Sequence, residues 1–131
     1  MYNKALVALG VALAVSACGE PSLEVNVPLA IVNVSPHDGA TEADPQVKPV
    51  LCFNRDMDAA LANGFLALET EAGGTEVGQG ISQAGSPRCL VVEHAGLESN
   101  AAYLVRAKEG LTAADGSALA VEIVSRLRTR R

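Results

Sequence analysis

The sequence predicts an all-β protein in which two antiparallel sheets pack face to face. Beyond residue 28 the apolar residues occur in short runs, and Gly, Pro, Asn and Asp separate these runs. Within several runs apolar and polar side chains alternate, as they do when one face of a strand is buried. Seven such runs in about 100 residues is the number expected of an immunoglobulin-like sandwich.

The predicted strands follow one another with turn sequences between them. In chain order they cover residues 30–34, 47–53, 65–69, 75–81, 88–93, 102–108 and 121–129. Turns are predicted at 35–39, 71–74, 85–87 and 115–117, because each of these segments contains Gly or Pro. A single helical turn is expected within residues 57–62, with Met57 as a core side chain.

Alternation also predicts which way individual side chains face. The side chains expected to face the core are Leu51, Phe53, Leu90, Val92, Tyr103, Val105, Ala107, Ile123 and Leu127. The side chains expected to face outward are Cys52, Cys89, Val91, Arg106, Lys108, Arg126, Arg128 and Arg130.

The N-terminal segment has the features of a secretory leader. Lys4 precedes the uncharged apolar run 5–15, which is shorter than the roughly 20 residues of a membrane-spanning helix and ends in small residues. The residues Val15-Ser16-Ala17-Cys18 resemble the bacterial lipobox, which implies cleavage before Cys18 and acylation of its thiol. Because Gly19 follows, the resemblance also implies sorting to the outer membrane. The alternative is an ordinary secretory leader in which Cys18 is incidental.

These features divide the chain into a lipoprotein signal peptide at 1–17, a lipidated Cys18 with an extended tether at 18–28, and one domain at 29–131. Loss of Lys4 leaves nine basic side chains against 15 acidic ones, a formal charge of −6. An acidic chain with a pI near 4.9 argues against nucleic acid as a partner.

Four sequence stretches carry a resemblance to a known family. They are 32–41 with its Ser-Pro-x-x-Gly-Ala turn, 50–58 with Phe before an Asp-Met pair, Leu97 with Tyr103 six residues later, and 111–119 with Asp-Gly before a Leu. Together they resemble the bacterial Ig-like domain of surface-layer and secreted proteins, over residues 30–130. The resemblance implies that Tyr103 either forms a tyrosine corner or is a core residue whose hydroxyl meets solvent.

Cys52 and Cys89 remain as an even pair once Cys18 carries lipid, and the compartment is oxidising. In the immunoglobulin-like order their strands are neighbours and both sulfurs lie on the outer face, so we expect a disulfide. A thiol nucleophile or a metal ligand is the alternative.

A basic stripe is expected where outward side chains of the last two strands meet. It consists of Arg106, Lys108, Arg126, Arg128 and Arg130. One interpretation is contact with an acidic partner, such as lipid phosphate or a protein. The other is protection of an edge strand against unwanted strand addition.

No metal site, cofactor or catalytic site is predicted. His37 and His94, beside Asp38 and Glu93, have no metal-ligand spacing and are better explained as exposed loop histidines. The first loops hold an acidic cluster in which calcium is conceivable, although no Asp-x-Asp-x-Asp-Gly loop is present. Its members are Asp38, Glu42, Asp44, Asp56 and Asp58. Gly-x-Ser-x-Gly, His-Glu-x-x-His and phosphate-loop motifs are absent from the sequence, so we do not expect an enzyme.

The sequence therefore predicts an outer-membrane lipoprotein, anchored through Cys18, whose single domain is a structural or protein-interaction module of the cell envelope. Its partners would be the membrane and a protein or cell-wall component. The alternative is a ligand-binding lipoprotein that holds calcium or cell-wall glycan at its loops.

Overall fold

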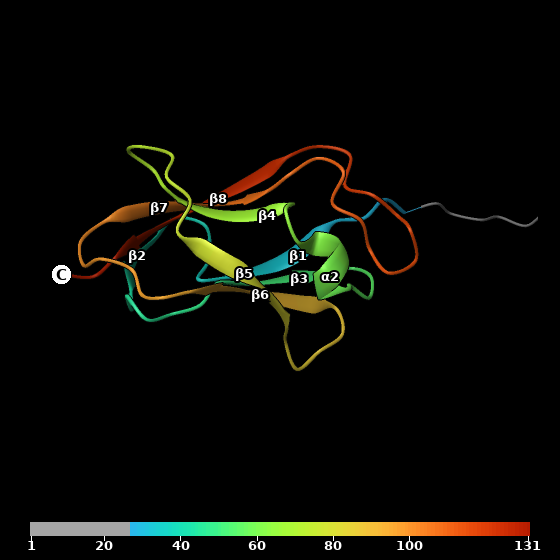
Figure 1. Cartoon of the computed structure of the whole chain (residues 1–131), viewed down its shortest axis with the longest axis horizontal. Coiled ribbons are helices and arrows are strands. Elements are labelled where there is room, and N and C mark those ends of the chain that lie inside the picture. Colours follow the sequence, from blue (N-terminus) through green and yellow to red (C-terminus); the bar gives the residue numbers. More distant parts are fainter. Residues whose placement is uncertain (1–26) are drawn as a thin grey trace, which may run out of the picture.

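The computed structural model describes residues 27–131, which form two facing four-stranded sheets (Figure 1). The strands of the first sheet are, in spatial order, β1 (Ile31–Ser35), β3 (Val50–Phe53), β6 (Cys89–His94) and β5 (Gly78–Gln83). Those of the second sheet are β2 (Ala40–Ala43), β8 (Ile123–Thr129), β7 (Ala102–Ala107) and β4 (Leu66–Thr70). The helical turn α2 (Ala59–Ala62) joins β3 to β4. Among the described residues no helix is long and apolar enough to cross a membrane.

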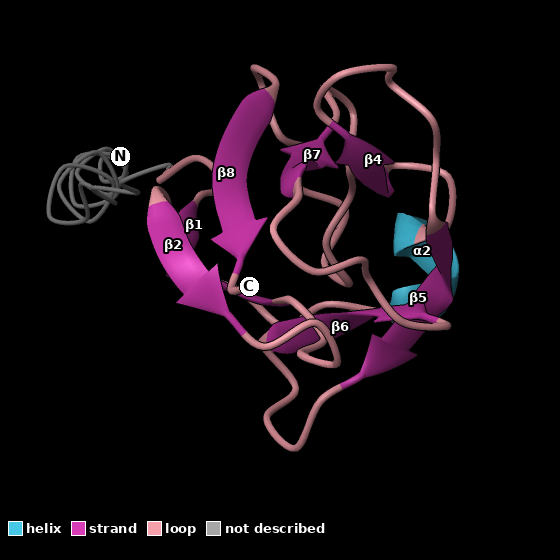
Figure 2. Ribbon diagram, turned by 90° about the vertical axis from the view of Figure 1, so that its left-hand side faces the viewer, coloured by secondary structure: helices cyan, strands magenta, loops and turns pink. Residues whose placement is uncertain are grey.

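The predicted immunoglobulin-like sandwich is confirmed, and the structure adds one strand to the seven expected. After β1 the chain leaves the first sheet and joins the second as β2, which runs parallel to β8 (Figure 2). Its pairing is short, with Ala40 opposite Leu127 and Ala43 opposite Thr129. The sequence did not predict this strand because Thr41 and Glu42 separate its two alanines, which gives neither alternation nor an apolar run.

The core is filled by the alternating side chains that the sequence predicts. Leu51, Phe53, Leu90 and Val105 are almost fully buried, and Met57 is buried as expected. The exception is Ile123, which was expected to face the core and is 37% exposed. It lies on the inward side of β8, in phase with three buried side chains. These are Ser125, Leu127 and Thr129.

Tyr103 ties a loop to the sandwich as a tyrosine corner does. Its hydroxyl oxygen accepts a hydrogen bond from the backbone N–H of Glu98, at 2.9 Å, and its ring is buried. The structure thus selects the tyrosine-corner interpretation over a core residue with a solvent-exposed hydroxyl.

His94 lies inside the sandwich, which corrects the expectation of an exposed loop histidine. Alternation along β6 places it on the same face as Leu90 and Val92, and it is buried. Its Nε2 lies 2.6 Å from the carbonyl oxygen of Val47, and its Nδ1 accepts a hydrogen bond from the N–H of Gly96. Both ring nitrogens therefore hold the loops at this end of the sheet. His37 is exposed, as expected.

Candidate functional site

An apolar cleft with a volume of about 640 Å³ opens along one side of the sandwich. One wall is β1 and the residues before it, and the other is the segment 119–125 that leads into β8. We call it the β1–β8 cleft. Its apolar lining consists of Leu29, Ala30, Ile31, Val32, Val34, Leu119, Ala120, Val121, Ile123 and Val124.

The cleft is open because β8 has a strand on both sides along only part of its length. β7 pairs with β8 from Ile123 onward, whereas β2 reaches it only from Leu127. On the other wall, β1 is the edge of its sheet and pairs with β3 alone. The inward-facing side chain of Ile123 therefore meets solvent instead of a covering strand.

Exposed apolar side chains gather at this cleft. Among the described residues the structure has seven exposed large apolar side chains, and four of them line the cleft. These are Val32, Val121, Ile123 and Val124. The other three are Val27, Leu61 and Phe65. A contiguous exposed apolar surface of this kind is typical of a binding site, whereas single exposed apolar residues are common everywhere.

Both walls of the cleft also present unpaired backbone groups. Arg126 bonds on its β2 side, since its N–H donates to Asp38 and its C=O accepts from Gly39. Backbone groups two residues apart point the same way, so those of Val124 point to the side that β2 does not reach. On β1, the N–H and C=O of Ala30 both bond to Asn54, so the backbone groups of Ile31, the next residue, point away from β3.

Three of the four arginines of the predicted basic stripe lie beside carboxylates. Arg106 contacts Glu122 and Glu69, the latter at 3.3 Å, and the hydrogen bond to Glu122 is the main reason that the pKa of Arg106 is raised. Arg126 lies 3.7 Å from Glu71.

The remaining members of the stripe lie toward the end of β8 and just beyond β7. Arg130 lies 3.4 Å from Asp44, and Arg128 donates to the carbonyl oxygen of Asn100. Lys108 follows the last residue of β7 and is exposed. Acidic neighbours therefore offset the charge of three of the four arginines in the stripe. Contact with an acidic partner stays a prediction.

The edge-protection interpretation is wrong for the end of β8. Arg126, Arg128 and Arg130 lie where β2 covers the strand, so this half of β8 is not an edge. The uncovered part is the start of β8, and it carries the apolar Ile123 and Val124 instead of charge.

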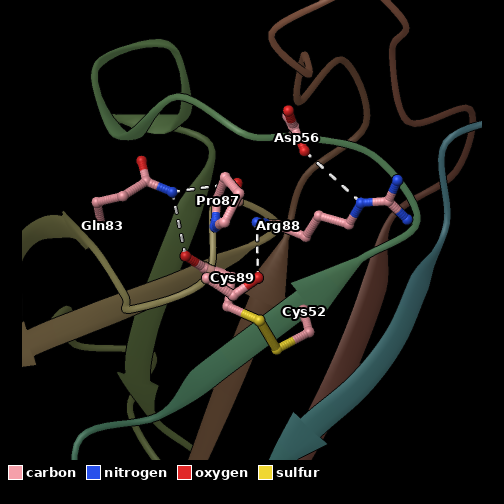
Figure 3. Close-up of a disulfide and its surroundings, with 7 residues drawn as sticks. Cys52, Asp56, Gln83, Pro87, Arg88 and Cys89 are labelled. Carbon is pink, nitrogen blue, oxygen red and sulfur yellow. Dashed lines mark hydrogen bonds and ion pairs between the residues drawn. A yellow bond between two sulfur atoms is a disulfide. The ribbon is translucent and has the colours of Figure 1, made fainter.

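Cys52 and Cys89 form a disulfide between β3 and β6, as expected (Figure 3). They lie opposite each other in the strand register, with Cα atoms 4.0 Å apart. The neighbouring Phe53 donates its N–H to Arg88 across this strand pair, so the two cysteines occupy a non-hydrogen-bonded position, where side chains lie closest. Both are half-buried on the outer face of the sheet.

The carboxylates for which calcium was considered do not converge. Asp58 caps α2 by accepting from the N–H of Ala60. Asp44 accepts from Gln46, which holds the pKa of Asp44 below its usual value. Within residues 27–131 no group of three or more His, Cys, Asp or Glu side chains could hold a metal ion. Cys18, the predicted lipidation site, lies outside the described residues.

A family model described as Bacterial Ig-like domain matches residues 25–128. No curated protein sequence matches the chain.

Three solved structures illustrate the likeness in fold. CopC from Methylosinus trichosporium OB3b has a TM-score of 0.63 and 21% identity, covering 78% of this chain and 93% of that one. PcoC, described as a methionine-rich copper resistance protein from Escherichia coli, has a TM-score of 0.63 and 13% identity, covering 79% and 100%. The N-terminal part of the bacterial S-layer protein SbsC has a TM-score of 0.59 and 14% identity, covering 92% of this chain and 26% of that one.

Proposed function

The chain belongs to the bacterial Ig-like domain family, and from this premise we propose that it is a non-catalytic interaction module of the bacterial envelope, held at the outer membrane by lipid on Cys18. The observation that carries the proposal is the β1–β8 cleft, where exposed apolar side chains and unpaired backbone groups lie together. Burial of apolar surface is the dominant favourable contribution to most protein association.

The anchor is supported by the sequence around Cys18 and by the place where the domain begins. Pro28 lines the mouth of the cleft and lies ten residues after Cys18. An extended segment of that length spans at most about 35 Å. A lipid on Cys18 would therefore keep the cleft close to the membrane, within reach of envelope proteins that share that surface.

PcoC is a copper resistance protein, but copper does not suit the described residues of this chain. Both ring nitrogens of His94 are already bonded, and Met57 is buried in the core. Calcium is not favoured either, because Asp44, Asp56 and Asp58 each serve a separate ion pair or hydrogen bond.

The anchor is tested by metabolic labelling with palmitate followed by membrane fractionation, comparing the wild type with Cys18→Ser. We expect label and membrane retention in the wild type and loss of both in the variant. A wild-type protein that is unlabelled and found in the soluble fraction would refute the anchor.

The interaction surface is tested with a photo-crosslinking amino acid placed in living cells at Val121, with Leu61 as the matched control. Both positions carry exposed apolar side chains, but only Val121 lies in the cleft. We expect crosslinked products from Val121 and few from Leu61. Equal yields from both positions would refute a specific docking site.

A further inference from the structure

We propose that the partner of the β1–β8 cleft is a second copy of this chain, whose residues 23–27 enter the cleft as an added strand. This inference rests on the proposed function, since it names the partner of the same surface. In a two-fold arrangement each copy both gives its segment and receives that of its neighbour.

The cleft has the features that an added strand requires. Extended segments bind by hydrogen bonding to a free strand edge while alternate side chains enter pockets. Here the backbone groups of Ile31 and Val124 point to the open side on the two walls. Apolar side chains line the space between these walls.

The segment before the domain has the matching pattern. Leu23, Val25 and Val27 alternate with Glu24 and Asn26. In an extended conformation the three apolar side chains therefore lie on one face and the two polar side chains on the other. This arrangement would bury the apolar face in the cleft and leave the polar face in water.

The segment also emerges at the mouth of the cleft, yet it is poorly placed to fill the cleft of its own chain. Asn54 fixes the chain there, since its side chain donates to the carbonyl oxygen of Pro28 and accepts from the N–H of Ala30. A segment returning into its own cleft would have to reverse before Pro28, and a reversal takes about four residues. Val25 and Val27 would then lie in the turn and could not enter their own cleft. They can enter the cleft of a neighbouring copy.

The test uses two tagged forms of the full chain expressed together, one carrying Val25→Cys and the other Val124→Cys. Cys52 and Cys89 are joined to each other, and under the proposed function the thiol of Cys18 carries lipid. We expect a disulfide-linked heterodimer on non-reducing gels. The control replaces Val124→Cys by Leu61→Cys, an exposed position on α2 outside the cleft, and should give little product. No heterodimer, or equal amounts with both partners, would overturn the proposal.

A second measurement determines the dimer dissociation constant of the detergent-solubilised full chain. Val124→Glu places a charge in the cleft and should weaken dimerisation at least about tenfold, equivalent to about 1.4 kcal/mol. Leu61→Glu should leave the dissociation constant unchanged. Pairing Val124→Glu with Val25→Lys should recover part of the loss. If Val124→Glu unfolds, Val25→Glu serves instead, because residue 25 precedes the first strand of the two sheets. A monomeric wild type would overturn the proposal.

The same measurements on Cys18→Ser separate this inference from the anchor. If Cys18→Ser is no longer membrane-bound but its copies still crosslink to each other, the proposed strand exchange is supported and does not require the lipid. A different outcome is a chain with Cys18 intact that is membrane-bound, does not crosslink to its own copy, and crosslinks to another protein from position 121. That outcome would support the anchor and refute the second copy as the partner.

Discussion

Removing the disulfide should destabilise the domain strongly, and the test is the double substitution Cys52→Ala with Cys89→Ala. Both residues must be changed, because a single substitution leaves a free thiol. The bond joins β3 and β6, the two inner strands of the first sheet. The side chains lie half-buried on the outer face, so alanine in their place leaves the core packing intact.

The expected magnitude follows from the 37 residues that separate the two cysteines. Closing a loop of that size lowers the entropy of the unfolded chain and stabilises the fold by about 4 kcal/mol in the chain-entropy model. For a domain of about 100 residues, each kcal/mol corresponds to roughly 4 °C or more in the midpoint of thermal unfolding. The double variant should therefore melt about 15 °C or more below the wild type.

The assay is thermal and urea unfolding, followed by circular dichroism at neutral pH. Wild-type protein treated with a reducing agent should behave like the double variant, because both lack the same crosslink. A decrease of less than about 1 kcal/mol in the free energy of unfolding would refute the reasoning. It would show that the unfolded chain is already restricted without the bond.

Three further predictions concern single side chains. Tyr103→Phe removes the hydroxyl that accepts from Glu98 and should cost about 1 kcal/mol in urea unfolding; an unchanged midpoint would show that the corner adds nothing. His94→Leu leaves two backbone groups without partners and should cost about 2 kcal/mol in the same assay, whereas a neutral result would mean that water replaces both bonds. Hydrogen bonds from Ser117 lower the pKa of Asp115 below its ordinary value of 3.8. Their contribution is therefore present above that pH and lost as the pH falls through the lowered pKa. The melting difference between wild type and Ser117→Ala should be present at pH 6 and shrink below pH 3.8; a pH-independent difference would contradict this.

Much of the fold could be predicted because the strands bury one face only. Alternation correctly placed Leu51 and Phe53 inside and Cys52 outside, and the same argument placed Cys89 on the outer face beside it. It failed for β2, because the pairing of that strand with β8 depends on residues more than 80 positions away.

The candidate site was harder to predict, because the exposure of an apolar side chain depends on whether a neighbouring strand covers that part of its own strand. The sequence indicated correctly that Ile123 lies on the inward side of β8, but nothing in its alternation shows that this end of the strand lacks a cover. His94 was misplaced for a different reason. The predicted strand ends at residue 93, which assigns His94 to the following loop, whereas β6 continues through His94 and keeps it in phase with Leu90 and Val92.

Because β2 pairs with only the second half of β8, it accounts for both the distribution of charged side chains along β8 and the position of the cleft. Where β2 covers β8, the outward side chains are arginines, two of which lie beside carboxylates, and backbone pairing closes the strand edge. The part of β8 that β2 does not reach carries Ile123 and Val124. Charged side chains at this unpaired edge would protect it against the addition of a strand from another chain. An edge left apolar and uncharged is better explained by a partner strand than by isolation in solvent. Under the proposed strand exchange, residues 23–27 would supply this partner strand, because they directly precede Pro28 in the lining of the cleft.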